Sequence, residues 1–232
     1  MRKSIIKQKK GQFIIIAILF IATMIISIGG MLYTTVTYYK YEPWEEYLTL
    51  IGSIELSSER LVELSLSNCT HTNDTSILRT NLGSWQRDLT KIYPGYGIEL
   101  DLKSEKDPDL NWYNPISFSN ASATFSLDIS FLGLSGYEFT AISFLNLTII
   151  NNPINSSIIN ATVTREAGNP VFNLKRNNFR LQEDSTVNIV SVTSRYDPNN
   201  TLVYIITCDG VISSPVTLSV CDHRGIKVEA TY

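Results

Sequence analysis

The apolar segment from Phe13 to Leu32 constrains this chain more than any other feature. Its 20 residues read FIIIAILFIATMIISIGGML and include no charged side chain. A helix of about this length is needed to cross the hydrocarbon core of a bilayer. We therefore predict a transmembrane helix over residues 12–37 of a chain of 232 residues.

The charges on either side of this segment predict its orientation. Five bases precede it, and the next base is Lys40; the five are Arg2, Lys3, Lys7, Lys9 and Lys10. Because cytoplasmic flanks are enriched in bases, the N-terminus is predicted to stay in the cytoplasm and the rest to be exported. We therefore expect a single-pass protein of the cell membrane. A cleaved secretory signal is the alternative, with Ser27-Ile28-Gly29 as its site.

The net charge of −3 hides two parts of opposite sign. Only five of the 19 bases lie in residues 1–32, which hold no acid. Residues 33–232 therefore hold 14 bases and 22 acids, a net charge of −8. Residues 33–232 therefore lack the cationic surface that phosphate contacts need, which excludes a basic nucleic-acid binder. The anchor also argues against a cytosolic enzyme.

The residues directly before the apolar segment carry a resemblance. Lys9-Lys10-Gly11-Gln12-Phe13 resembles the class III signal peptide of archaeal type IV pilins and pilin-like proteins. The resemblance covers about 25 residues. It implies that a prepilin peptidase cuts between Gly11 and Gln12, or one residue away, and that the mature helix packs with its copies in a filament core.

One departure from that family concerns the start of the mature helix. Bacterial pilins carry a glutamate five residues in, where this chain has Ile16 or a neighbour, although archaeal members often lack it. An uncleaved signal-anchor would also place bases before the segment. It therefore remains an alternative.

Two helices are predicted after the membrane, in a helical stalk over residues 38–95. Pro43 can start the first, which we expect over 44–67. Its apolar positions follow heptad spacing, with Ser57 as a gap: Tyr47, Leu50, Ile54, Leu61 and Leu64. The polar residues 68–75 interrupt the pattern. The second helix is expected over 77–93, from Leu78, Leu82, Trp85, Leu89 and Ile92.

From Ile98 the pattern changes to the alternation typical of strands. Residues 121–131 alternate strictly between apolar and polar side chains, which predicts a strand with one face in a core. Further strands are expected at 137–150, 158–164, 187–194, 201–208, 215–221 and 226–231.

Residues 161–184 resemble an immunoglobulin-like module of exported microbial proteins. The matching residues are Gly168, Pro170, Val171, Leu174, Phe179, Glu183 and Asp184. The resemblance implies a β-sandwich that serves as a spacer or an adhesive domain. The expected fold class is α+β. A basic leader (1–11), the transmembrane helix (12–37) and the stalk (38–95) precede a β-rich region (96–150) and an immunoglobulin-like sandwich (151–232).

Seven Asn-x-Ser/Thr sequons make N-glycosylation a candidate modification. They lie at Asn68, Asn73, Asn120, Asn146, Asn155, Asn160 and Asn199. Their number is about twice what the content of Asn, Ser and Thr gives by chance. The alternative is that they are ordinary polar residues of strands and loops.

Three cysteines follow the anchor, and an exported body allows a disulfide. Cys208 and Cys221 are the candidate pair. If 201–208 and 215–221 formed one hairpin, however, these residues would lie roughly 20 Å apart, far beyond disulfide reach. The bridge therefore requires a different sheet assignment, and Cys69 would be left free or pair between chains.

No residue pattern predicts catalysis or a cofactor. His71 and His223 lack partners at metal-ligand spacing, and Asp222-His223-Arg224 has no nucleophilic serine motif to serve. Asp107, Asp109 and Asn111 have the spacing of a calcium loop, but Trp112 and Phe118 occupy the places of its Gly and Glu. A solvated turn is the favoured interpretation.

These observations predict a structural or adhesive surface protein, a pilin-like filament or envelope component. Its partners would be the membrane, copies of its own N-terminal helix and a prepilin peptidase, but no nucleic acid. A monomeric anchored binding protein is the first alternative, and an exported enzyme, which no motif supports, is the second.

Overall fold

A computed structural model of the chain describes residues 3–40, 44–103, 109–112, 117–182, 187–213 and 215–232. The chain divides into two compact units, Met1–Leu50 and Ile51–Tyr232. We call the second unit the body. Each unit is described by itself.

The first unit contains one continuous helix, α1 (Lys3–Lys40). It includes the predicted transmembrane segment and begins well before it, within the predicted leader. The polar residues ahead of Gly11 include Lys and Gln, which are good helix formers, so nothing in them stops the helix. Along residues 15–35 every side chain is exposed.

Two helices open the body: α2 (Trp44–Thr72), of which Ile51 and later residues belong here, and α3 (Ile77–Ile92). The buried stripe of α2 contains Ile54, Ser58, Val62, Leu66 and Cys69. The predicted seam is therefore wrong at Leu64, which is exposed. The helix also continues past residue 67, because Cys69 and Thr70 are buried on the same face.

Polar bonds join the two helices where the apolar pattern has gaps. The indole Nε1 of Trp85 donates to Ser58 Oγ at 3.1 Å, and Asn81 Nδ2 donates to Ser65 Oγ at 2.9 Å. Both serine side chains are buried, so each bond satisfies a group that would otherwise be costly. The predicted apolar stripe of α3 is confirmed at Leu78, Leu82 and Leu89.

A seven-stranded antiparallel sheet forms most of the body. Its order is β1-β3-β4-β5-β8-β7, with β2 paired to β3 outside this path. The bounds are β1 Ile98–Leu102, β2 Asp109–Trp112, β3 Phe118–Ile129, β4 Leu134–Ile149, β5 Ile158–Arg165, β7 Ile189–Tyr196 and β8 Leu202–Cys208. The alternation predicted for β3 is confirmed, because its inward residues Ala121 to Ile129 are all buried.

A second, three-stranded sheet has the order β10-β9-β6, with β6 at Phe179–Leu181, β9 at Thr217–Cys221 and β10 at Lys227–Thr231. The segments 201–208 and 215–221 therefore do not form the hairpin that we considered from sequence. β8 pairs with β5 and β7, whereas β9 pairs with β6 and β10. Phe179 and Tyr204 bring the sheets together, with ring centroids 5.4 Å apart.

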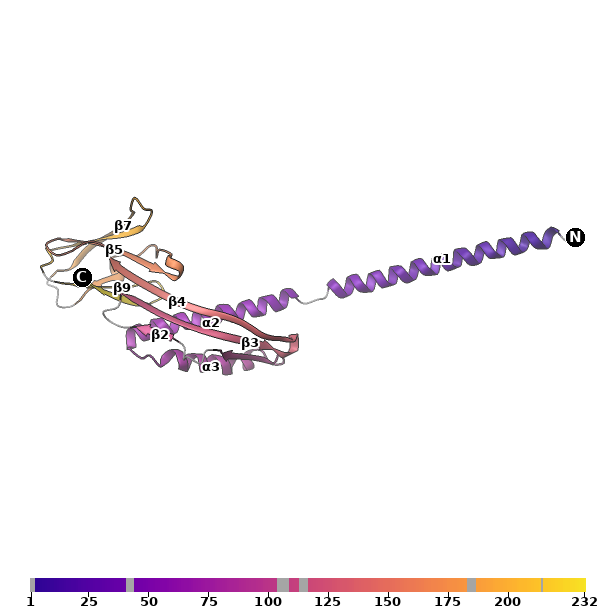
Figure 1. Cartoon of the computed structure of the whole chain (residues 1–232), viewed down its shortest axis with the longest axis horizontal. Helices are drawn as coiled ribbons and strands as arrows, with labels where there is room; N and C mark the ends of the chain where they lie inside the picture. Colours follow the sequence, from indigo (N-terminus) through magenta and orange to yellow (C-terminus); the bar gives the residue numbers. More distant parts are fainter. Residues whose placement is uncertain (1–2, 41–43, 104–108, 113–116, 183–186, 214) are drawn as a thin grey trace. The chain divides into compact units, whose positions relative to one another are not determined.

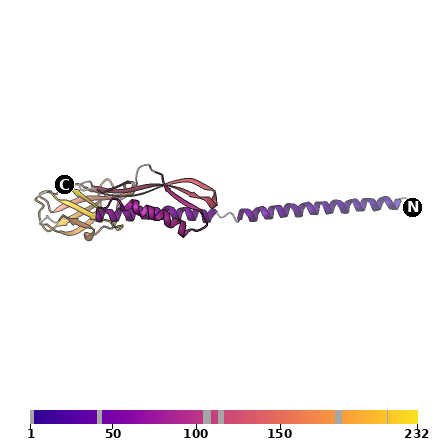
Figure 2. The ribbon, with the colours of Figure 1, turned by 90° about the horizontal axis from the view of Figure 1, so that it is seen from below.

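The helices and the two sheets enclose a common core. Figures 1 and 2 show α2 and α3 running alongside the long β3–β4 hairpin. The smaller sheet lies near the end of these two strands that is away from their connecting turn. The predicted α+β layout is confirmed: one apolar N-terminal helix, two further helices and a largely β-sandwich region. The predicted division at residue 150 has no counterpart in the hydrogen bonding, since β4 and β5 pair across it.

Candidate functional site

The leader residues and the apolar segment belong to one helix. Lys9, Lys10, Gly11, Gln12 and Phe13 all lie within α1. Ile15–Thr35 is a 21-residue stretch long and apolar enough to span a membrane, and none of it is buried. A helix that is apolar on every side has no polar face to present to water. Such a helix is compatible with a membrane span or with a signal segment.

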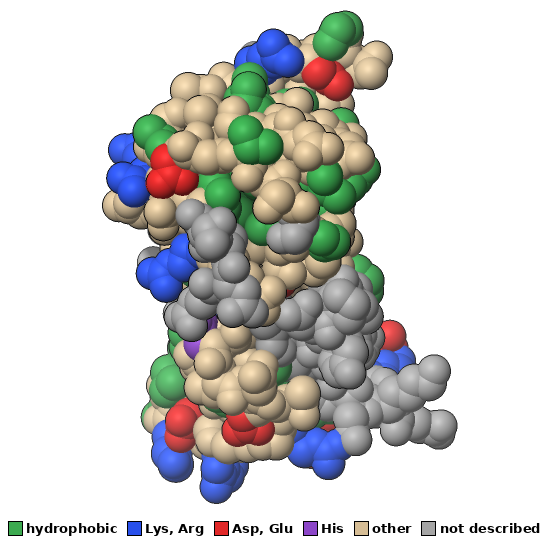
Figure 3. Space-filling view, turned by 90° about the vertical axis from the view of Figure 1, so that its left-hand side faces the viewer, with side chains coloured by type: hydrophobic (Ala, Val, Ile, Leu, Met, Phe, Trp, Pro, Cys, Tyr) green, Lys and Arg blue, Asp and Glu red, His purple; other side chains and the backbone are tan. Residues whose placement is uncertain are grey.

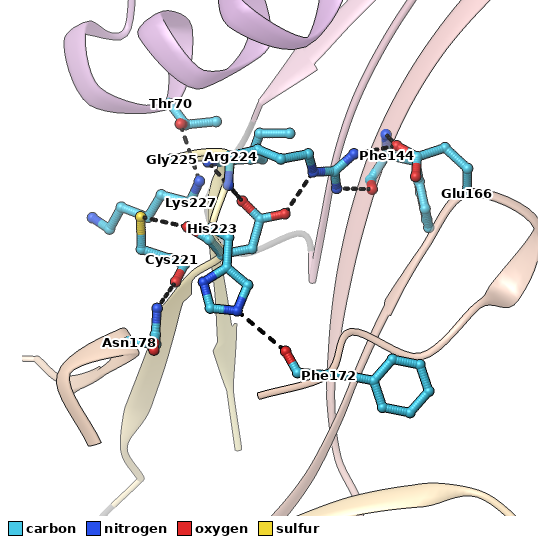
Figure 4. Close-up of polar contacts among 12 residues, drawn as sticks. Thr70, Phe144, Glu166, Phe172, Asn178, Cys221, His223, Arg224, Gly225 and Lys227 are labelled. Carbon is cyan, nitrogen blue, oxygen red and sulfur yellow. Dashed lines mark hydrogen bonds and ion pairs between the residues drawn. The ribbon is translucent and has the colours of Figure 1, made fainter. Parts of the chain in front are cut away.

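A densely bonded polar cluster among the described residues of the body is a second feature, which we call the Arg224 clamp. It consists of Arg224, Asp222, Glu166 and the backbone of Phe144. Figure 4 labels Arg224, Glu166 and Phe144 of this cluster. Arg224 Nε donates to Asp222 Oδ2 at 2.7 Å, Nη1 to Glu166 Oε1 at 2.6 Å, and Nη2 to the carbonyl oxygen of Phe144 at 2.9 Å. The planar guanidinium is suited to such a set of fixed donors.

The clamp completes the sheet where a strand runs out of partners. β5 pairs with β4 only up to the pair Leu145–Arg165. At the next residue of β4, Phe144, the amide donates to Glu166 Oε1 at 2.7 Å and the carbonyl accepts from Arg224. Two side chains thus take the place of a missing strand. Because Arg224 follows β9 and Glu166 follows β5, the clamp also ties the two sheets together.

Asp222 organises the turn between β9 and β10. Its side chain is only 2% exposed, and its Oδ1 accepts from the amides of Arg224 at 3.0 Å and Ile226 at 3.1 Å. With Arg224 on Oδ2, this buried carboxylate is both paired and hydrogen-bonded, as a buried charge must be.

The electrostatics of the clamp stabilise its charged form. Burial raises the pKa of the Glu166 carboxyl, but the hydrogen bonds from Arg224 and the Phe144 amide outweigh it, so that the pKa lies below the ordinary value. Burial lowers the pKa of Arg224, and the two carboxylates raise it above its usual value. Nearby Glu63 on α2 differs: burial raises its pKa, with Arg224 lowering it and Asp222 raising it further.

The same turn docks onto α2. His71 Nε2 donates to the Gly225 carbonyl at 2.9 Å, and the Lys227 amide donates to Thr70 Oγ1 at 3.1 Å. Gly225 has φ of +84°, and a Cβ there would lie 2.6 Å from Ser67 Oγ. Only glycine therefore fits this close approach. These bonds join α2 to the smaller sheet, and Arg224 in turn joins the smaller sheet to Phe144 of the larger one and to Glu166.

Sequence reasoning did not find this clamp. Asp222-His223-Arg224 was considered only as part of a catalytic triad. In the structure Asp222 and Arg224 bind each other, and His223 Nε2 donates to the carbonyl of Phe172 at 3.2 Å. The turn itself could have been recognised from an Asp three residues before a Gly. The partner Glu166 is 58 residues away from Arg224, and no local pattern connects them.

The sequons fall into two groups. Asn68, Asn73, Asn155 and Asn199 are exposed, the last three in loops and Asn68 on α2. Asn120, Asn146 and Asn160 are half-buried on the strands β3, β4 and β5. Asn120 Oδ1 is buried and has no hydrogen-bond partner among the described residues. The exposed group has room for a glycan, whereas the strand group is more restricted.

The three cysteines are free thiols. The candidate bridge Cys208–Cys221 is not formed, although β8 and β9 belong to different sheets and the hairpin that would have kept these residues apart is absent. Cys69 and Cys208 are buried and Cys221 is half-buried. Burial raises the pKa of all three thiols, and nearby carboxylates raise it further. Each therefore lies far from the reactive thiolate form.

The remaining candidates are metal sites. Asp109 and Asn111 of the calcium-like spacing lie on the strand β2, while Asp107 lies outside the described residues. Among the residues that the structure describes, no three His, Cys, Asp or Glu side chains are arranged to hold a metal ion.

One groove of about 730 Å³ lies between the edge strands β6 and β7, with Arg176 and Arg180 in its lining. Arg176 Nε already donates a hydrogen bond to the carbonyl oxygen of Ile189 at 2.8 Å. On the face seen in Figure 3, acidic and basic side chains are scattered around the edge of the molecule instead of forming one patch.

No family model, no curated protein and no solved structure matches this chain.

Proposed function

We propose that this protein is a single-pass, membrane-anchored surface protein with a structural or adhesive role, a pilin-like component of a filament or of the cell envelope. The observation that carries the proposal is the stretch Ile15–Thr35 of α1, which is apolar on all sides and comes just after Lys9-Lys10-Gly11-Gln12-Phe13 in the same helix. The N-terminus stays in the cytoplasm, and the body faces outward.

The body supports a passive role through its stability devices. In the Arg224 clamp, both side-chain ion pairs of Arg224 are made with other residues of the fold, Glu166 and Asp222. A β-sandwich fastened in this way suits a spacer or an adhesive domain exposed outside the cell. Exposed sequons at Asn73, Asn155 and Asn199 would carry glycans on that surface.

The immunoglobulin-like character of the C-terminal part belongs to the same proposal. This part of the proposal is supported by the positions of several residues that carry the resemblance. Gly168 has φ of +74°, Pro170 bridges to Thr164, and Val171 and Phe179 are buried. Glu183 and Asp184 of the same pattern lie outside the described residues.

The test is the N-terminus of the mature protein, read by intact-mass measurement after extraction from membranes of the native host. A start at Gln12 or Phe13 supports prepilin processing. An intact Met1 would leave a simple anchor and remove the pilin-like part. A start at Gly30 would identify a secreted protein and refute the anchor.

A matched pair of variants sharpens this test. Gly11→Ile removes the small residue before the expected cut, and we expect the uncut precursor to accumulate. Gly29→Ile is the control: a Cβ at this position of α1 meets no atom within 4 Å, so the helix accommodates it. Processing that fails equally in both variants would contradict cleavage at Gly11.

A further inference from the structure

The end of the body at the β3–β4 turn exposes a group of aromatic and aliphatic side chains. We call Ile92, Tyr93, Tyr96 and Phe131 the tip patch. The Tyr93 and Tyr96 rings meet edge to face at 6.3 Å, and those of Tyr96 and Phe131 at 5.8 Å. Phe131 is 67% exposed and Ile92 is 54% exposed. The amide of Phe131 donates to the Tyr96 carbonyl at 3.1 Å, which holds the turn and the end of α3 together.

This tip is the end at which the chain enters the body. Tyr137, just after the turn, donates its hydroxyl to Glu55 Oε1 at 2.7 Å, one helical turn after Ile51. The opposite end of α2 is bonded to β10 through Thr70 and Lys227. In Figure 1 the turn between β3 and β4 accordingly lies beside the beginning of the body portion of α2.

The membrane-spanning stretch puts a limit on how far the tip can be from lipid. The stretch ends at Thr35 and the body begins at Ile51, 16 positions later. Even fully extended, that length of chain spans at most about 55 Å. Because the tether joins the body at the tip end, the tip patch is within reach of the bilayer surface.

The chemistry of the patch suits the interfacial region of a bilayer. Tyrosine combines an apolar ring with a hydroxyl, and such rings collect at the level of the lipid headgroups. Two nearby bases are paired, Lys91 with Asp88 at 3.0 Å and Lys103 with Glu138, whereas the acids Glu99 and Asp128 lie opposite each other on β1 and β3. The four side chains of the patch itself carry no charge at neutral pH.

The size of the patch favours lipid over a second copy of the chain. Two exposed and two half-buried side chains offer roughly 300–400 Å², given about 200 Å² for a fully exposed aromatic or large aliphatic residue. A stable protein interface needs about 800 Å² on each partner. A tethered contact needs less, because the anchor already supplies a high effective concentration of lipid.

We propose that the tip patch lies in the headgroup region of the membrane that α1 spans, so that the body is held against the surface at its β3–β4 end. This inference rests on the proposed anchor. The kind of partner is a lipid surface.

The experiment uses the full-length protein, with Cys221→Ser, in vesicles of host-like lipids. Phe131→Cys carries a small environment-sensitive fluorophore, and Ile92→Cys provides a second labelling site. The control is Val211→Cys, an apolar residue that is 59% exposed near the opposite end of the body. Quenching by lipids with a nitroxide near the headgroup is then measured for each site at a high lipid-to-protein ratio.

We expect quenching at positions 131 and 92 to exceed that at position 211 by at least about twofold. Equal quenching at all three, in protein that resists alkaline extraction from the vesicles, would overturn the inference and leave the anchor intact. A difference that vanishes on dilution into excess lipid would identify a second copy as the partner and would also overturn it. Protein that is extracted by alkali would refute the anchor and this inference together.

Discussion

Replacing Arg224 with methionine tests whether the clamp holds the two sheets together. Methionine fills a similar volume but has no donor. The carboxylate of Asp222 would keep its two backbone amides and lose its charged partner, although its side chain is only 2% exposed. Glu166 and the Phe144 carbonyl would each lose a donor as well.

The structure sets the size of the effect. Removing one partner of a buried ion pair costs about 3–5 kcal/mol, because the other charge stays buried without compensation. Arg224 is 16% exposed and binds one nearly buried and one partly exposed carboxylate, so that this range applies without a large discount for solvent. For a unit of this size about 1 kcal/mol shifts Tm by 2–4 °C. The expected loss is therefore roughly 6–20 °C.

The assay is thermal unfolding of the full chain in detergent, followed by circular dichroism. Arg87→Met is the matched control, since the exposed Arg87 hydrogen-bonds only within its own helix, to Gly83 and Ser84. Its expected cost is below about 0.5 kcal/mol. If Arg224→Met melts within 2 °C of the control, the clamp does not stabilise the body and the reasoning is refuted.

Acid pH gives the same substitution a second readout. The pKa of Glu166 lies below the value of about 4.3 expected in the unfolded chain. Its contribution is thus present above pH 4.3 and is lost as the pH falls through the lowered pKa. Because Arg224 supplies part of that contribution, the difference in Tm between wild type and Arg224→Met should shrink below pH 4. A difference that stays constant down to pH 3 would contradict this.

Three further predictions concern single sites. Gly225→Ala should cost about 2–4 kcal/mol in unfolding free energy, from a positive φ and a Cβ that would clash with α2, whereas Gly136→Ala meets open space and should cost only about 1 kcal/mol; equal losses in urea titrations would contradict this. Glu63→Gln should raise Tm at pH 7 by the equivalent of about 1 kcal/mol or less, because burial raises the pKa of that carboxyl. The gain should disappear near pH 4, and a gain that persists there would refute burial of the charge as its cause. Tyr204→Phe removes a buried hydroxyl that donates to the Val171 carbonyl at 2.5 Å and should cost about 1–3 kcal/mol, while the exposed Tyr196→Phe should leave stability unchanged.

The strands could be predicted because one face of each lies in the core. Alternation in β3 and β4 follows from the two-residue period of a strand, and it correctly identified Phe125, Leu127 and Leu145 as inward residues. The same reasoning failed at Phe131, which continues the pattern in sequence but lies in a turn after β3 and is exposed. The alternation of apolar and polar residues does not indicate the residue at which a strand ends.

The buried face of α2 was predicted only in part: Leu50 and Ile54 are buried as expected, but the rest of the stripe was missed for a different reason. Its buried stripe includes Ser58 and Ser65, which a count of apolar residues reads as solvent-exposed. They are buried because Trp85 and Asn81 of α3 donate hydrogen bonds to them. Such a pairing exists only after the two helices have packed, so the spacing of residues within α2 cannot predict it.

The sequence by itself determined the apolar segment, its basic flank and the succession of helices and strands, since these depend on neighbours along the chain. The tertiary structure alone decided that β8 and β9 enter different sheets, that Cys208 and Cys221 stay apart, and that Arg224 meets Glu166. Those outcomes join residues far apart in the chain. They are set by how the sheets pack, and local propensity carries no information about that.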